Sequence, residues 1–314
     1  MSHRYVVLLT LFLAHSWALA EKIRIVTWNV REAFTVGDVT KRKADFAAAA
    51  KSLDPDIILL QEIVSQQVAV AIRNAMGLKG YHVVCSNFTT DAPTHAAFEV
   101  AIISRFPIAQ VIEYDPSPSG PDDEDVEEAP LEPSKKLGLA KVTTDRGFLW
   151  AHVPDKKITL AVVHLKSSRG AVGKSDKTNA QKREFVIAAV AASVNEDRGL
   201  FPGYAYLVAG DFNVGHSDPK KNGTDLDEDC FSNCGSKDLY DDTHALLAEG
   251  LVGSLKMKNL ALSIPDSTFP DFPGSPIDNI YVSGDLAGRF SNAQKASNGF
   301  GSDHLAVSTV FDAP

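Results

Sequence analysis

The sequence predicts an α/β protein in which two β-sheets pack face to face and helices cover their outer sides. Three observations lead to this fold class. Segments typical of strands recur along the chain of 314 residues, a few helical segments lie between them, and no internal repeat or linker divides the chain. We therefore expect residues 21–314 to form a single domain.

The N-terminal part of this region begins with a strand and then alternates helices with strands. Residues 23–30 alternate in hydrophobicity, as in a half-buried strand, and residues 56–63 (DIILLQEI) are almost wholly apolar, as in a buried one. Helical patterns cover residues 38–53 and 65–76. The other predicted elements are strands at residues 81–86, 100–104, 141–143, 148–152, 159–164, 204–209, 279–282 and 306–311, and a helix at residues 179–195.

Two segments are predicted to be surface loops on this domain. Residues 113–136 contain five prolines and an acidic run, and residues 215–242 are rich in Asp, Gly, Asn and Lys.

The first twenty residues have the layout of a signal peptide. A short basic start precedes an apolar run, and Ala18-Leu19-Ala20 forms a small-x-small cleavage site. The apolar run is shorter than the roughly 20 residues that span a bilayer, which disfavours a membrane anchor. We therefore expect cleavage near Ala20, secretion to the extracellular or periplasmic space, and no stable membrane insertion.

The net charge is −9, and removal of residues 1–20 takes away one arginine and no acid, which gives −10. Such a chain gains little from non-specific attraction to polyanions. Bound divalent cations can invert the local field, so a nucleic-acid substrate is not excluded.

Polar residues suited to catalysis lie at the ends of six predicted strands. Each has an ordinary interpretation alone, since Asp and Asn stabilise turns and a Glu after an apolar run is usually solvated. Strand ends in a layered fold converge at one rim, however, so these residues can share a site. They are Asn29 and Arg31, Glu62, His164, Asp211 and Asn213, Asp278, and Asp303 with His304.

The motifs WNVRE, DIILLQEI, LAVVHLKS, VAGDFN, PIDNIYVS and GSDHLAV, in this order, resemble the signature set of the endonuclease/exonuclease/phosphatase superfamily. The resemblance runs from about Ile23 to Phe311. No single motif is specific, although GDFN is the best of them, whereas the ordered set is highly specific. It implies a four-layered, DNase I-like α/β sandwich with two packed mixed sheets flanked by helices.

The resemblance also implies a divalent metal. Phosphodiester hydrolysis needs an attacking water, neutralised charge on phosphorus and a stabilised leaving oxygen. Mg²⁺ or Mn²⁺ serves the last two needs and prefers oxygen ligands. Glu62 would be the principal ligand, with Asn29 and Asp303 beside it.

The remaining motif residues take catalytic roles by the same resemblance. Asp211 and Asn213 would orient the water and hold a phosphate oxygen. His164 and His304 would be general acid and base, because the pKa of histidine lies near neutrality. Each imidazole needs a carboxylate to fix its tautomer. Asp278 is the family partner for His304, and Glu99 is the candidate partner for His164.

Details of the motifs bear on the branch of the superfamily. Abasic-site enzymes usually carry Pro-Asn where this chain has His164-Leu165, and an acid near the position of Arg31. Asn29-Val30-Arg31 instead resembles secreted DNase I-type nucleases, in which this arginine contacts a phosphate. Those nucleases also carry an arginine at the position of Val64, which enters the minor groove, and an aromatic residue at the position of Ala97. Because this chain lacks both residues, efficient cutting of duplex DNA is in doubt. Duplex DNA, single strands, RNA and non-nucleic phosphodiesters all remain candidate substrates.

Several polar groups outside the motifs have two interpretations. Cys230 and Cys234 are expected to form a small disulfide after export, with metal binding the alternative. The acidic run at residues 225–229 could hold structural Ca²⁺, although it lacks EF-hand spacing. Basic residues after His164 could form a cationic lip over the site or a solvated face; they are Lys166, Arg169, Lys174, Lys177, Lys182 and Arg183.

The sequence thus predicts a secreted, monomeric, metal-dependent phosphodiesterase that cleaves DNA, with RNA as another polymer, as an endonuclease. The alternative is a sphingomyelinase-like or inositol-phosphate enzyme, for which Phe34 and residues 269–272 would form a lipid-facing rim. A non-catalytic binding protein is disfavoured because every required motif residue is present.

Overall fold

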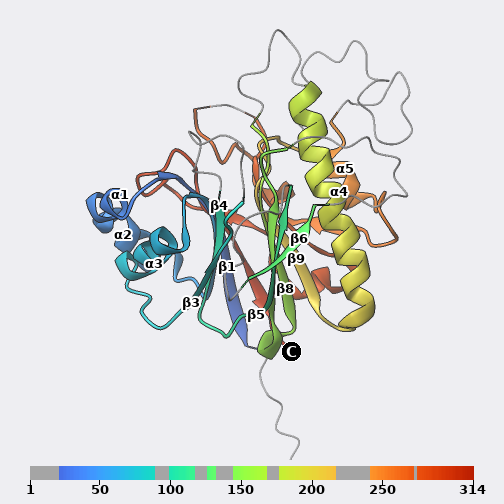
Figure 1. Ribbon diagram of the computed structural model, residues 1–314, viewed down its shortest axis with the longest axis horizontal. Helices are drawn as coiled ribbons and strands as arrows, with labels where there is room; N and C mark the ends of the chain where they lie inside the picture. Colours follow the sequence, from blue (N-terminus) through green and yellow to red (C-terminus); the bar gives the residue numbers. More distant parts are fainter. Residues whose placement is uncertain are drawn as a thin grey trace, which may run out of the picture.

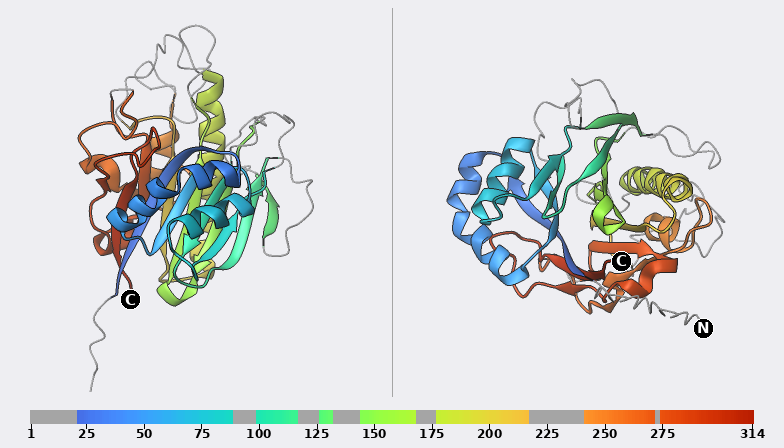
Figure 2. Two further views of the ribbon diagram at one scale, coloured as in Figure 1. Left: turned by 90° about the vertical axis from the view of Figure 1, so that its left-hand side faces the viewer. Right: turned by 90° about the horizontal axis from the view of Figure 1, so that it is seen from below.

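The computed structural model describes residues 21–88, 99–116, 126–131, 144–167, 177–216, 241–271 and 274–314. Two mixed β-sheets pack face to face, and helices cover the outer side of each, which gives four layers (Figure 1). The predicted α/β sandwich is confirmed. The right-hand view of Figure 2 shows the sheets between the two groups of helices.

The first sheet has the strand order β12-β13-β1-β2-β4-β3. Its central strand β1 (Lys22–Ala33) pairs in parallel with β2 (Ile57–Ile63) and antiparallel with β13 (Val307–Asp312). β4 (Glu99–Ser104) lies between β2 and β3, and the edge strands are β3 (His82–Cys85) and β12 (Gln294–Lys295). β2 is buried along almost its whole length, as its apolar sequence predicts.

The second sheet has the strand order β10-β11-β9-β8-β7-β5-β6. β8 (Ile158–His164) and β9 (Ala205–Asp211) are parallel, and β9 is antiparallel to β11 (Asp278–Ser283). The remaining strands are β10 (Met257–Asn259), β7 (Phe148–Val153), β5 (Ala109–Asp115) and β6 (Glu127–Pro130).

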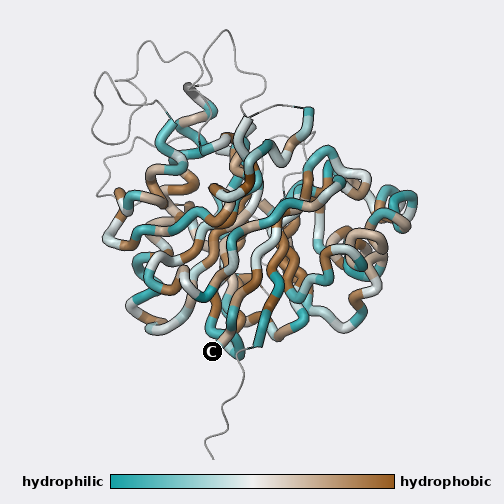
Figure 3. Tube along the Cα trace, turned by 180° about the vertical axis from the view of Figure 1, so that it is seen from behind, coloured by the Kyte–Doolittle hydropathy of each residue, from teal (hydrophilic) through white to brown (hydrophobic). Residues whose placement is uncertain are grey.

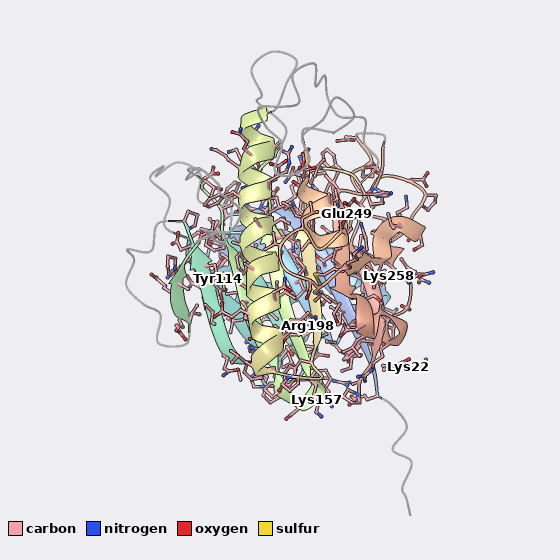
Figure 4. The ribbon with its side chains drawn as sticks, turned by 90° about the vertical axis from the view of Figure 1, so that its right-hand side faces the viewer. Lys22, Tyr114, Lys157, Arg198, Glu249 and Lys258 are labelled. Atoms are coloured by element: carbon pink, nitrogen blue, oxygen red, sulfur yellow. The ribbon has the colours of Figure 1, made fainter. Side chains whose placement is uncertain are left out.

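The helices divide between the two outer faces. α1 (Val36–Lys41), α2 (Lys43–Leu53) and α3 (Gln66–Ala75) cover the first sheet, while α4 (Lys177–Leu200) and α5 (Thr243–Ala248) cover the second. Figure 4 shows α4 along the outer face of the second sheet, with Arg198 in its C-terminal part. The single helix predicted at residues 38–53 is wrong, because the chain leaves helical geometry at Arg42 and forms α1 and α2.

The core lies in three layers, one between the sheets and one beneath each group of helices. The hydropathy colouring of Figure 3 shows apolar residues concentrated along the inner strands. Trp28 of β1 is fully buried under the first group of helices, where Phe46 and Phe300 meet its ring edge-on. Burial of such side chains stabilises the fold by about 1.5–3 kcal/mol each.

The loop prediction for residues 113–136 is wrong in part. β5 extends to Asp115, and β6 pairs with it in parallel at the edge of the second sheet. Val126 and Leu131, on either side of β6, are buried and anchor it, and Pro130 is tolerated there because edge strands can lack one ladder donor. Residues 1–20, residues 141–143, the acidic run at 225–229, Cys230 and Cys234 lie outside the described residues.

The sequence did not predict the short strands β10 (three residues) and β12 (two residues) or the helix α5 (six residues). Elements this short carry too little hydrophobic periodicity to be recognised. Among the described helices, none is long and apolar enough to cross a bilayer.

The topology brings the catalytic motifs to one edge. The starts of β1 and β8 lie together at the bottom of the molecule, near Lys22 and Lys157 in Figure 4. β1 and β2 are parallel, as are β8 and β9, so their C-terminal ends share the opposite edge. β13 and β11 run antiparallel to these strands, so they begin at that edge.

Candidate active site

Asn29 joins the two sheets at this edge. Its fully buried side chain comes from β1, and its Nδ2 donates to Glu62 Oε1 of β2 (3.0 Å) and to Asp211 Oδ2 of β9 (3.1 Å). One amide group therefore holds two carboxylates, from different sheets, side by side. The packed sheets bring together residues that are 182 positions apart in sequence.

Left-handed backbone conformations concentrate at the same edge. Non-glycine residues adopt positive φ rarely, at a cost of about 1–3 kcal/mol each, and such strain clusters at functional sites. The strain bends the end of β1 so that Glu32 N can donate to Glu62 Oε2 (2.8 Å). The residues are Arg31 (φ 55°), Glu32 (46°), Glu62 (62°) and Asn213 (56°).

The GDFN turn begins at the end of β9, and two hydrogen bonds made by its own side chains stabilise it. Asp211 Oδ1 accepts from Asn213 N (2.8 Å), and Asn213 Nδ2 donates to Leu165 O (2.9 Å). The turn requires glycine at position 210, because a Cβ there would overlap the carbonyl group of Val163 on β8. The close approach of β8 and β9 thus places His164 and Asp211 at the same level.

His304 is fixed by a carboxylate and an aromatic ring. Its Nδ1 lies 2.9 Å from Asp278 Oδ2 at the start of β11, and the Phe269 ring packs against the imidazole with centroids 4.8 Å apart. Ser302 Oγ accepts from His304 N and donates to Asn29 O, which ties this loop to β1. The predicted pairing of His304 with Asp278 is therefore observed as a direct contact.

His164 lies on the other side of Asp211. Its Nε2 is 3.6 Å from Asp211 Oδ2 and 3.9 Å from Glu62 Oε1. His304 Nε2 is 3.8 Å from the same Asp211 oxygen. Two imidazoles thus face one buried carboxylate.

The charges around His304 favour its protonated form. Burial lowers the pKa of His304, but Asp278, Asp211 and Asp303 outweigh burial and raise it to about 10. The imidazole is therefore positively charged at neutral pH.

The surroundings of His164 act in the opposite direction. Burial, the guanidinium of Arg146 and the charges on His304 and Lys166 hold the pKa of His164 well below its ordinary value. The imidazole is neutral at pH 7. The pKa values of the two histidines therefore depart from the near-neutral value expected, in opposite directions. Acids outweigh burial at His304, whereas nearby positive charges add to burial at His164.

Asp211 is also perturbed. Burial raises the pKa of its carboxyl group, Asp278 and Glu62 raise it further, and His304 opposes them. One ligand atom each from Asp211, Asp278 and His304 lies within 4.8 Å of the others. A surplus of crowded carboxylates at one edge is the setting that a cation relieves.

The donor set at the edge suits a hard divalent ion. Carboxylate and amide oxygens are the groups that Mg²⁺ and Mn²⁺ prefer. The Glu62 side chain is 23% exposed and Asp303 25% exposed, so both reach the open side of the edge. Asn29, the third predicted ligand, is adjacent to Glu62 but turns its Nδ2 toward that carboxylate while its Oδ1 accepts from Arg31 N (3.0 Å). Glu62 and Asp303 have the chemistry and exposure of the predicted metal ligands, whereas Asn29 would need an amide rotation to offer its oxygen. Their placement together around one ion stays a prediction.

Arg31 is the exposed cation beside this group. Its side chain is 56% exposed, and its Nε lies 3.7 Å from Asp303 Oδ2. Arg42 Nη1 donates to Arg31 O (2.9 Å) and supports the bent end of β1. A phosphate arriving at the edge would meet the Arg31 guanidinium.

Glu99 has different partners from the one expected. It lies at the start of β4, where its buried carboxylate accepts from Ser86 Oγ (2.6 Å) and Phe88 N (2.9 Å). Burial raises its pKa to about 7. Its pairing with His164 stays a prediction.

The interpretation of the basic segment after His164 as a cationic lip is wrong for Arg183, whose side chain is buried, while Lys166 stays partly exposed beside an acidic partner. Lys166 pairs with Asp145 (3.0 Å). Arg183 is buried in an ion pair with Asp241 (2.5 Å) and donates to Lys166 O. Of the remaining basic residues in this segment, Arg169 and Lys174 are outside the described residues, as is the side chain of Lys177.

Arg146 is a residue that sequence reasoning missed. Its buried guanidinium donates to the carbonyl groups of His164 and Leu165, directly behind the catalytic edge. The only sequence signal is an arginine beside glycine just before a strand, in DRGFLW, and nothing local indicates that it contacts β8.

The chain resembles known proteins over most of its length. A sequence profile of the Endonuclease/Exonuclease/phosphatase family matches residues 26–304. The chain belongs to this family. The matched segment includes every motif residue at the edge, from Asn29 to His304. No curated protein sequence matches the chain significantly.

Solved structures share the fold at low identity. The chain is similar to a 3′ phosphatase from Neisseria bound to a product DNA hairpin, with 19% identity, 92% and 99% of the two chains covered and a TM-score of 0.58. It is also similar to an AP endonuclease from Archaeoglobus fulgidus, with 18% identity, 93% and 100% covered and a TM-score of 0.57. A mannosyl-6-phosphatase from Bacteroides thetaiotaomicron gives 17% identity, 91% and 98% covered and a TM-score of 0.55. Family membership identifies the chain as a phosphodiesterase or phosphatase of a superfamily that typically uses divalent metal ions.

Proposed function

We propose that this family member is a secreted, divalent-metal-dependent endonuclease of the DNase I type that hydrolyses DNA. The observation that carries the proposal is the placement of Asp211 Oδ2 between His164 Nε2 and His304 Nε2, at 3.6 and 3.8 Å. An exposed arginine lies at the same edge. This arrangement provides a proton acceptor and a charged imidazole on one side of a phosphate, a hydrogen-bond donor on the other, and a cation to bind it.

His304 and Asp211 act on the attacking water. Asp278 holds the His304 ring through Nδ1, so that Nε2 faces the site. Asp211, with its raised pKa, accepts the proton of the water, and the His304 imidazolium stabilises the resulting charge. Asn213 keeps the Asp211 carboxylate in place through its backbone N–H.

His164 acts on the leaving oxygen. A neutral imidazole with its proton on Nε2 can donate a hydrogen bond to the departing 3′ oxygen as negative charge develops there. Arg31 holds a non-bridging phosphate oxygen. A divalent cation held by Glu62 and Asp303 would, when bound, neutralise charge on phosphorus and on the leaving group.

Several features support the DNase I branch and secretion. Arg31 is exposed beside Asp303, as expected for a phosphate contact, and the sequence at residues 1–20 has the layout of a signal peptide. Val64, at the position of the minor-groove arginine, offers no cation. We therefore expect single-stranded DNA to be cut at least as well as duplex DNA, with RNA as a weaker substrate.

The exposure of the phenylalanines proposed for a lipid-facing rim bears on the sphingomyelinase-like alternative. Phe269, one of the residues proposed for a lipid-facing rim, is buried against His304, whereas Phe34 is 44% exposed. In the described part of the chain, Phe34 and its neighbour Val36 are the exposed apolar residues of this region, and two such side chains are ordinary on a protein surface; Phe272 lies outside the described residues. A nucleic acid is therefore the favoured substrate.

The proposal is tested with the purified chain from Glu21 and Mg²⁺ or Mn²⁺. Supercoiled plasmid, single-stranded DNA and RNA are incubated separately, each with an EDTA control. Cutting that EDTA abolishes supports the endonuclease. Inactivity on all three, with release of phosphocholine from sphingomyelin or of phosphate from inositol phosphates, would overturn it in favour of the alternative.

A further inference from the structure

His244 on α5 has no role in the chemistry above, yet its imidazole contacts β11, which carries Asp278, and the turn that follows Asp211 at the end of β9. Its Nε2 lies 3.0 Å from Val214 O, immediately after the GDFN turn, and its Nδ1 lies 2.6 Å from Tyr281 Oη. Tyr281 belongs to β11, three residues after Asp278. Figure 4 shows α5 beside α4, with Glu249 just beyond the end of α5.

The aromatic packing fixes the plane of this imidazole. The fully buried Phe212 ring stacks on His244 with an interplanar angle of 12° and centroids 5.5 Å apart. Tyr281 packs against both rings. The His244 ring therefore has little freedom to rotate, and both nitrogens are directed at defined partners.

The partners determine the tautomer. A backbone carbonyl oxygen can only accept, so Nε2 must carry the proton that Val214 O receives. In the neutral ring, Nδ1 then accepts from the Tyr281 hydroxyl. Burial raises the pKa of Tyr281, so that the hydroxyl keeps its proton.

We propose that His244 is a positioning residue for the catalytic turn at residues 211–214, through its Nε2–H bond to the Val214 carbonyl. Asn213 lies between Phe212, on which the ring stacks, and Val214, to which it donates. These two contacts hold the left-handed conformation of Asn213 (φ 56°) from outside the site. The turn in turn presents the Asn213 N–H to Asp211 Oδ1.

The inference rests on the proposed function in one respect, since the turn is taken to be catalytic. His244→Gln and His244→Asn separate the two nitrogens, because a glutamine amide reaches the position of Nε2 and an asparagine amide that of Nδ1. His244→Gln should keep the Val214 bond and lower kcat less than about threefold. His244→Asn should lose it and lower kcat about 10- to 100-fold, with KM changed less than about threefold, since small displacements of catalytic groups cost this much. Tyr281→Phe should fall between the two.

The experiment measures kcat and KM on single-stranded DNA for these variants, with His82→Gln as control. His82 is exposed on β3, away from the catalytic edge. Native-state hydrogen exchange of the Asn213 amide is followed in the same samples. Faster exchange and lower kcat in His244→Asn, with both near wild type in His244→Gln, support the proposal.

Equal loss of activity in both variants, or unchanged Asn213 exchange in His244→Asn, would overturn it. If the wild-type chain cuts no nucleic acid, the proposed function fails, and the exchange measurement still decides whether His244 holds the turn. The wild-type protein should also show the Nε2–H tautomer of His244 by nitrogen NMR. The Nδ1–H tautomer would contradict the donor role.

Discussion

The two histidines of the candidate site are the same residue type in opposite surroundings. His304 faces Asp278, Asp211 and Asp303, and its pKa rises to about 10. His164 is equally buried, but Arg146 lies behind it and its pKa falls well below the ordinary value. The packing, rather than the residue type, therefore assigns one histidine to carry charge and the other to remain neutral.

This difference arises from which neighbours each histidine meets at the junction of the two sheets. Carboxylates gather on the side where β9, β11 and the loop before β13 meet. A buried guanidinium lies on the other side, where it supports the end of β8. A phosphate between the two imidazoles would therefore meet a charged donor on one side and a neutral donor on the other.

The largest effect is expected for His304→Ala. Loss of the charged imidazole removes the positive charge that stabilises the attacking water as Asp211 takes its proton, so kcat should fall about 10²- to 10⁴-fold. Steady-state kinetics on the preferred nucleic acid, with thermal unfolding as a folding control, measures this. His82→Gln is the matched control and should remain at the wild-type rate. Activity within tenfold of wild type in folded His304→Ala would contradict the role.

Asp278→Asn should lower kcat about 10- to 100-fold, because the partner that orients the imidazole is lost. It should also lower the pKa of His304 from about 10, since Asp278 is its strongest charge partner. NMR titration of the metal-free protein follows this pKa. An unchanged titration would show that other groups hold the proton.

Arg146→Met should reduce the difference between the pKa values of His164 and His304. Removal of the positive charge behind β8 should raise the pKa of His164, and the loss of two donors to the His164 and Leu165 carbonyl groups should lower kcat about tenfold. Arg146→Lys keeps the charge and serves as the matched control for the pKa. A pKa of His164 that falls or stays constant in Arg146→Met would contradict the assigned cause.

Arg31→Met should act on binding. Loss of one phosphate contact should raise KM several-fold, change kcat little, and reduce the salt slope of binding by about one. Arg105 is the control, because it pairs with Glu21 at the opposite edge, and Arg105→Met should leave the slope unchanged. A kcat effect as large as that of His304→Ala would place Arg31 in the chemical step instead.

The smallest effect on activity is expected for Glu184→Gln. This variant tests whether a raised carboxyl pKa by itself identifies a catalytic residue. Glu184 is a buried residue of α4, and burial raises its pKa to about 9. The folded state then binds one proton more than the unfolded state between about pH 4.5 and pH 9. The free energy of unfolding should fall with rising pH in this range, by up to about 1.4 kcal/mol per pH unit.

Glu184→Gln should flatten this pH dependence and leave kcat within about twofold. Denaturant unfolding at several pH values measures the slope, and Glu249→Gln, at the exposed end of α5, is the control. An unchanged slope in Glu184→Gln would show that Glu184 is not the titrating group.

The sequence predicted the catalytic edge because its signals are local. Apolar runs such as residues 56–63 identify strands, and the polar residue that follows each run marks where the strand ends. The family motifs then supply the order. Local patterns could not predict β6 or β12, since very short edge strands form only through pairing with neighbours already in place.

The electrostatics could not be predicted for the same reason. Arg146 approaches His164 from 18 positions away, and Arg183 pairs with Asp241 across 58 positions. In the sequence, Arg146 carries no functional signal, and Arg183 is predicted only as part of an exposed basic segment. The neutral state of His164 and the buried ion pair of Arg183 follow only from the packing of β8, α4 and the segment before α5.

The central claim is that this edge is one metal-dependent hydrolytic site, and Glu62→Gln tests it most directly. Glutamine keeps the shape of the side chain and an acceptor for Glu32 N, but it removes the charge that would hold a divalent ion. Hydrolysis of single-stranded DNA and of a chromogenic phosphodiester should require Mg²⁺ or Mn²⁺ in wild type and fall at least about 10²-fold in folded Glu62→Gln. Undiminished hydrolysis by Glu62→Gln, or hydrolysis by wild type that persists in EDTA, would contradict the account.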